Sequence, residues 1–192
     1  MSQFGKIELQ KIEKLVECAS KGCSDTFSKW IHSEVAVDLD RVGVVSYSDL
    51  SKKVQAGDDV GIGIYLDIQG DLTGGLLYLF DEDSATRLIQ QLTKKKDVTF
   101  SSVEQSALLE TGNILASSYL SLLGNELGLQ VVPGPPIFMH DMAMSILDSV
   151  LAEQALVQKD ALLCNVKFNQ GGKSLNCQFF FLPELERLKK VV

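Results

Sequence analysis

Residues 102–123 read SVEQSALLETGNILASSYLSLL, a stretch without proline in which apolar side chains recur every three or four residues. A serine at 101 or 102 can cap its start, with an acid or amide at 104 or 105 to complete a capping box. Glycines at 124 and 128 follow its end. The pattern predicts a long helix. Its small and polar side chains fall within an arc of about 80° at roughly 100° per residue, and we call them the polar stripe: Ser106, Glu110, Asn113, Ser117 and Ser121.

The polar stripe allows two interpretations. It can be the solvated side of a core helix, as most polar helix faces are. Solvated faces usually carry several Lys and Glu side chains, however, whereas Glu110 is the single charge of this stripe. Serines on either side of one acid and one amide leave room for a partner molecule to approach. The second interpretation is therefore a binding or catalytic surface.

The rest of the chain alternates between helical and strand-like patterns. A period near 3.6 predicts helices at 7–31, 82–92 and 141–156, with a short helix after Pro183. A period of two or a short apolar run predicts strands at 35–47, 60–68, 76–80, 129–132, 161–168 and 175–182. Hairpins that alternate with helices predict an α+β fold, a mainly antiparallel sheet with long helices on one face.

The two halves of the chain resemble each other. An offset of 93 positions brings Leu15-Val16-Glu17 onto Leu108-Leu109-Glu110. At 192 residues one domain is the default. We therefore expect a single domain, 1–192, built as a pseudo-duplicated unit of two repeats at about 7–95 and 100–182.

Composition excludes several classes of function. The formal net charge of −7 repels phosphate backbones, so we expect no nucleic-acid partner, and Lys94-Lys95-Lys96 is interpreted as the cationic end of a helix. The longest charge-free stretch of the second half, 111–125, is too polar and too short to span a bilayer, so we expect no membrane partner. The four cysteines match no disulfide scaffold or zinc spacing. We expect a cytoplasmic protein with reduced thiols and no metal site.

The polar stripe also carries a spacing that resembles a known signature. Ser106-x3-Glu110-x2-Asn113, followed by Pro136, resembles the active-site signature of the CheC/CheX/FliY phosphatases of bacterial chemotaxis. The segment 70–74 and the pair Pro135-Pro136 ahead of Asp141 are also similar to that family. The resemblance implies a phosphatase, a hydrolase of the aspartyl phosphate on a CheY-like response regulator in two-component signalling.

The same resemblance implies roles for individual residues. Asn113 and Glu110 would be catalytic: Asn113 would hold the attacking water, and Glu110 would pair with a lysine of the regulator. Ser106, Ser117 and Pro136 would contact or support the partner-binding surface. The chain would need no cofactor of its own, because Mg²⁺ would come with the regulator. A CheD-like deamidase and a homodimer are further partners that the family suggests.

The first half departs from the signature. The offset of 93 places Glu17 and Ser20 on Glu110 and Asn113, and a more conventional family register places Lys14 and Glu17 there. Neither register pairs an acid with an amide, so we expect one working site and a degenerate first site. Two alternatives remain open at this point. They are a non-catalytic adaptor that binds a receiver domain or a flagellar or chemotaxis partner through the same stripe, and a sheet-mediated dimerisation module.

Overall fold

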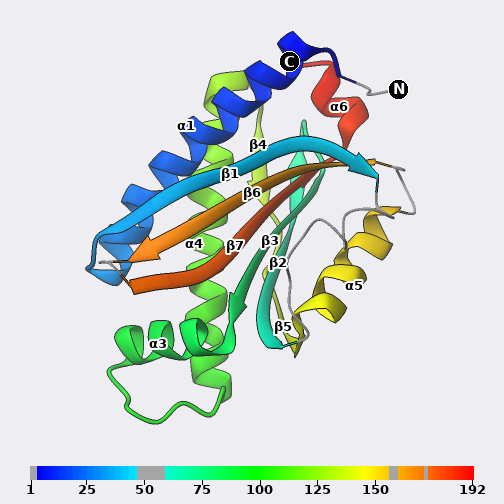
Figure 1. Ribbon diagram of the computed structural model, residues 1–192. Helices are drawn as coiled ribbons and strands as arrows, with labels where there is room; N and C mark the ends of the chain where they lie inside the picture. The colour runs from blue at the N-terminus through cyan, green and yellow to red at the C-terminus, as the bar shows by residue number, and fades with distance from the viewer. Residues whose placement is uncertain (1–3, 47–58, 156–159, 171–172) are drawn as a thin grey trace.

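The computed structural model describes residues 4–46, 59–155, 160–170 and 173–192 (Figure 1). Along the chain the elements are α1 (Lys6–Ile31), β1 (Val35–Ser46), β2 (Val60–Gly70), β3 (Gly74–Asp81), α3 (Glu82–Thr93), α4 (Ser102–Leu127), β4 (Val131–Pro133), β5 (Ile137–Met142), α5 (Ala143–Ala155), β6 (Asp160–Gln170), β7 (Lys173–Pro183) and α6 (Leu185–Lys189). The predicted α+β class is confirmed, and most predicted elements lie where the patterns indicated.

A single antiparallel sheet organises the fold. Its strands follow the order β1-β6-β7-β3-β2-β4, with β5 also paired to β2. The hairpin β2–β3 is buried on both faces, since six consecutive residues of each strand are inaccessible to solvent. Helices therefore have to cover both faces of the sheet.

The long helices α1 and α4 cover one face together, as predicted. Their core side chains pack on alternate residues of β2, including Ile62 and Ile64. The expectation that every long helix lies on this face is corrected for α5, which packs on the opposite face against Leu77, Leu79 and Phe180 (Figure 1). The reason is the sheet itself, whose central strands have apolar residues on both sides.

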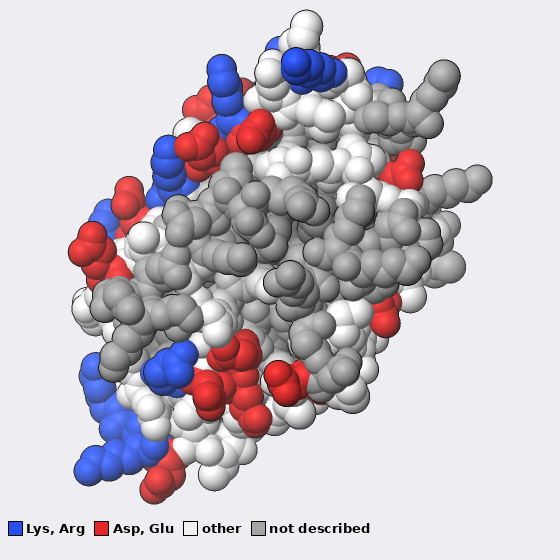
Figure 2. All heavy atoms as spheres, viewed as in Figure 1, with Lys and Arg blue, Asp and Glu red and all other residues white. Residues whose placement is uncertain are grey.

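Helices α1 and α4 lie antiparallel and in close contact. The Oγ1 of Thr26 and the Oγ of Ser118 share a hydrogen bond of 2.9 Å, and a Cβ at Gly22 would lie 2.2 Å from Leu122 Cδ1. A glycine at 22 thus lets the two helices approach. The outward face of α1 mixes acidic and basic side chains in the ordinary way, as the upper left of Figure 2 shows.

The strand order agrees with the predicted duplication. Exchanging β1 with β5, β2 with β6 and β3 with β7 reproduces the same neighbours in reverse order. Ser102, the first residue of α4, lies 96 positions after Lys6, the first residue of α1, and both helices have 26 residues. The helix starts thus agree with the second register of the sequence analysis, in which Lys14 and Glu17 lie 96 positions before Glu110 and Asn113. The assignment of repeats to 7–95 and 100–182 stays a prediction.

One strand was missed by the sequence patterns. The stretch 137–142 was expected to lead directly into a helix at Asp141, but it forms β5, which pairs with β2 from Tyr65 to Val60, and α5 begins at Ala143. Its residues are exposed or half-buried, so they show no alternation. Among the described residues, no helix combines the length and apolar character that a bilayer span requires.

Candidate functional site

The start of α4 is firmly held by a capping box. The buried carboxylate of Glu104 accepts hydrogen bonds from the Ser101 N–H at 2.9 Å and the Thr99 N–H at 3.1 Å, and it pairs with Lys95 Nζ at 3.5 Å. These contacts, the Ser101 N–H foremost, lower the pKa of the Glu104 carboxyl to about 2. The first turn of the helix that carries the polar stripe is therefore held in place, and the helix begins at Ser102, eight residues before Glu110.

The structure places the predicted catalytic pair on one accessible side of α4. Glu110 is exposed and Asn113 is half-buried. Three residues separate them, which puts their side chains about 60° apart around the helix and one turn apart along it. Both side chains can thus reach one visiting molecule.

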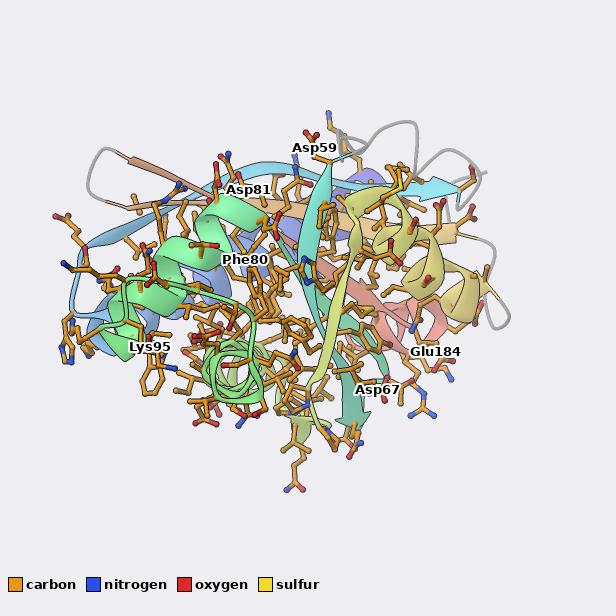
Figure 3. The ribbon with its side chains drawn as sticks, turned by 90° about the horizontal axis from the view of Figure 1, so that it is seen from below. Asp59, Asp67, Phe80, Asp81, Lys95 and Glu184 are labelled. Carbon is orange, nitrogen blue, oxygen red and sulfur yellow. The ribbon has the colours of Figure 1, made fainter. Side chains whose placement is uncertain are left out.

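Two of the predicted partner-binding residues lie on α4 on either side of this pair, and the third lies in a loop. Ser106 and Ser117 are exposed on α4, and the Ser106 hydroxyl donates to the Ser102 carbonyl at 2.8 Å. Pro136 is half-buried in the connection between β4 and β5. Both of these strands pair with β2. Figure 3 looks along α4 and shows β5 on one side of the helix and α3 on the other.

A hollow of about 440 Å³ opens beside Glu110. Its walls come from three helix ends and comprise Trp30, Ile31, His32, Gln91, Leu92, Thr93, Lys94, Ala107 and Glu110. We call it the acidic hollow after Glu110, the one acidic residue of its lining, which also includes Lys94. Two hydrogen bonds hold its walls together: Trp30 Nε1 donates to Thr111 Oγ1 at 3.0 Å, and Gln91 Nε2 donates to the Ile31 carbonyl at 2.5 Å. No sequence pattern indicated it, because its residues come from three separate segments.

A second hollow, of about 390 Å³, lies at the other end of the helix pair. Its lining includes Lys11, Lys14, Glu126 and Leu127. At the offset of 96, Lys11 corresponds to Ala107 and Lys14 to Glu110, while Glu126 and Leu127 correspond to residues 30 and 31 of the acidic hollow. At this offset the linings of the two hollows match at these positions, with Lys14 in place of Glu110.

The two registers named for the degenerate first site differ in the exposure of their residues. The expected pair was Glu17 and Ser20, but Ser20 is only 3% exposed, so it cannot face a partner. The offset of 96 instead places Lys14 and Glu17, both exposed, opposite Glu110 and Asn113. No acid–amide pair results, and the absence of activity in the first half stays a prediction.

Other reactive groups lie away from the stripe. Burial raises the pKa of the Cys23 thiol to about 12 and that of Cys177 well above its ordinary value, whereas Cys18 is exposed. In the part of the chain that the structure describes, no cluster of three or more His, Cys, Asp or Glu side chains could hold a metal ion.

Comparisons with known proteins agree with this geometry. No family model matches the chain. The CheY-P phosphatase CheC of Bacillus subtilis is 26% identical over 201 residues, which cover 100% of this chain and 96% of that protein. FliY of Thermotoga maritima has the same fold, with a TM-score of 0.74 at 12% identity over 98% of this chain and 96% of the other. Over its whole length this chain is similar to CheC in sequence and to FliY in fold.

A CheX structure is also similar to this chain. CheX in the CheX-CheY-BeF3-Mg²⁺ complex of Borrelia burgdorferi superposes with a TM-score of 0.58 at 14% identity, over 88% of this chain and 97% of that one. The resemblance found in the stripe signature is therefore confirmed for the chain as a whole. Glu110 and Asn113, the acid and the amide of that signature, are both accessible on α4.

Proposed function

We propose that this protein hydrolyses the aspartyl phosphate of a CheY-like response regulator in chemotaxis or a related two-component pathway. The observation that carries the proposal is the accessible placement of Glu110 and Asn113 on one side of α4, in a chain whose full-length relative is named as a CheY-P phosphatase. That name favours turnover over the adaptor function, and the structure offers no feature that favours the dimerisation module.

The chemistry suits a neutral amide. An acyl phosphate already has a good leaving group, so catalysis requires chiefly a water molecule held in line with the phosphorus atom. The side-chain amide of Asn113 can both donate to and accept from such a water. It does so without placing a negative charge beside the phosphoryl oxygens, as an aspartate would.

Glu110 supplies orientation in this proposal. Its carboxylate, one turn before Asn113 and exposed, can pair with a lysine at the phosphorylation site of the regulator and so fix the register of the two proteins. Ser106 and Ser117 would lie within the contact, and Pro136 would border it. The Mg²⁺ would be held by the regulator, so this chain supplies no metal ligand.

The test is the decay of phosphorylated regulator with and without this protein. Each CheY-like receiver domain of the source organism is phosphorylated in the presence of Mg²⁺ and its decay is followed over time. We expect the wild-type protein to accelerate decay of at least one regulator. Asn113→Ala should reduce the acceleration of decay by about 100-fold or more. Glu110→Ala should reduce it by about tenfold or more.

The matched control is Ser121→Ala, an exposed residue of the same stripe two turns beyond Asn113. It should retain the wild-type rate. Binding of a regulator without any acceleration of decay would contradict the proposal in favour of the adaptor. A CheD-like deamidase partner, a homodimer and a cytoplasmic location are carried forward from the family resemblance and the composition as predictions.

A further inference from the structure

A group of lysines lies next to the acidic hollow. Lys94, Lys95 and Lys96 follow the end of α3 and are all exposed, in a chain whose formal net charge is −7. We call residues 94–96 the lysine loop. Figure 2 shows basic side chains gathered at the lower left, where α3 ends in Figure 1. Lys94 itself lines the hollow, as does Glu110.

The lysine loop is fixed in place. The Lys94 N–H donates to the Gln90 carbonyl at 2.9 Å, and Gln90 Nε2 donates to the Lys96 carbonyl at 2.6 Å. Lys95 Nζ pairs with Glu104 at the start of α4, beside which Figure 3 labels Lys95. The loop is therefore tied both to α3 and to the helix that carries Glu110 and Asn113.

Two of these charges are available to a partner. Among the described residues, Lys95 has an acidic partner in Glu104, whereas Lys94 and Lys96 form no ion pair. Asp97 is the nearest acidic residue along the chain and is exposed. Unpaired cations held in a fixed geometry contribute to the recognition of negative surfaces, mainly through the association rate.

The expected partner presents such a surface. A phosphorylated aspartate carries about two negative charges, one more than the free carboxylate. The carboxylates that hold Mg²⁺ add further negative charge around it, which the ion offsets in part. A protein with a charge of −7 would repel that surface unless positive charge were concentrated at the contact. The lysine loop supplies positive charge on the same side of the molecule as the catalytic pair.

We propose that the lysine loop is the docking contact for the acidic rim of the regulator's phosphorylation site. The proposal rests on the proposed function and identifies the part of the surface that sets affinity. Lys94 and Lys96 attract the rim, the acidic hollow lies between the lysine loop and α4, and Glu110 and Asn113 act at the phosphoryl group. The lysines contribute to binding and not to the chemical step.

The chain offers a matched control in two lysines beside the second hollow. Lys189 and Lys190 are exposed at the end of α6, directly before Val191 and Val192, which line the second hollow. That hollow has Lys14 at the position of Glu110. Charge reversal at Lys189 and Lys190 changes the net charge by the same amount as reversal at Lys94 and Lys96, but beside the opposite end of α4 from Glu110.

The experiment compares Lys94→Glu/Lys96→Glu with Lys189→Glu/Lys190→Glu. Circular dichroism and urea unfolding first establish that both variants fold. The Kd for the regulator loaded with Mg²⁺ and beryllofluoride is then measured together with the KM and kcat for phosphorylated regulator. We expect Lys94→Glu/Lys96→Glu to have a Kd and a KM about tenfold above those of the wild type at low salt, with kcat unchanged. Near about 0.5 M salt the Kd and KM of the two proteins should become equal.

Each outcome separates the two proposals. If the wild-type protein accelerates decay and both variants have equal KM, the docking proposal is wrong while the phosphatase function stands. If the wild-type protein binds the regulator without turnover and only the loop variant weakens binding, the docking proposal stands and the phosphatase function is wrong. If no regulator of the source organism binds, both are wrong.

Discussion

Gly112 lies where α4 approaches β2 of the sheet closely. A Cβ built at this position would lie 2.6 Å from Ile64 Cγ2 on β2, whereas carbon atoms in contact prefer about 3.5–4.0 Å. Gly112→Ala therefore requires the helix and strand to separate by roughly 1 Å. Overpacking of this kind costs about 1–3 kcal/mol, and the better helix propensity of alanine offsets about 1 kcal/mol of it.

We expect Gly112→Ala to lower the free energy of unfolding by about 0–2 kcal/mol and to reduce phosphatase activity further, because the shifted helix carries Glu110 and Asn113. Ile64→Ala alone should cost about 2–5 kcal/mol through a cavity. In the double variant the new methyl group occupies part of that cavity. The double variant should therefore cost at least about 1 kcal/mol less than the sum of the single variants.

The assay is urea unfolding of the four proteins, followed by circular dichroism, with the decay of phosphorylated regulator measured alongside. A Gly112→Ala protein that is more stable than the wild type by about 1 kcal/mol, the propensity term alone, would refute the close-contact argument. Strict additivity with Ile64→Ala would refute it as well, since the two side chains would then not interact.

Three further outcomes are expected. The Glu104 carboxyl has a pKa of about 2 in the folded protein against an ordinary 4.5, so its contribution to stability is complete above pH 4.5 and disappears as the pH falls toward 2. The urea midpoint of unfolding, plotted against pH between about 3 and 6, should therefore rise less steeply for Glu104→Gln than for the wild type. Equal slopes in the two proteins would contradict this assignment. Trp30→Phe removes the hydrogen bond to Thr111 and should cost about 1 kcal/mol in urea unfolding, with no loss at all as the contrary result. Labelling of the native protein with a thiol reagent at pH 8 should be unaffected by Cys23→Ser and reduced by Cys18→Ser, because burial raises the pKa of the Cys23 thiol to about 12; loss of fast labelling in Cys23→Ser would contradict the assignment.

Local signals predicted the elements that contain the site. The capping box at the start of α4 is visible in the sequence, and the helix begins at Ser102 as expected. The hairpin β2–β3 was equally clear, because two apolar runs flank a glycine-rich turn. The polar stripe followed directly from helix geometry, since Glu110 and Asn113 lie one turn apart in any regular helix.

Features set by tertiary packing could not be predicted in this way. β5 is a strand because β2 offers it a free edge, and its own residues carry no strand pattern. The sequence offered two registers, at offsets of 93 and 96, and only the matching starts of α1 and α4 in the folded chain favour 96. The acidic hollow depends on three helix ends that meet only in the folded chain.

The most direct test of the account is the rate of phosphorylated-regulator decay at a saturating concentration of Asn113→Ala, beside its Kd for the beryllofluoride-loaded regulator. The account predicts that the variant binds within about twofold of the wild type, since the amide acts on water and not on the partner, and that decay falls to the regulator's own rate. Decay as fast as with the wild-type protein would show that the amide of Asn113 does not position the attacking water.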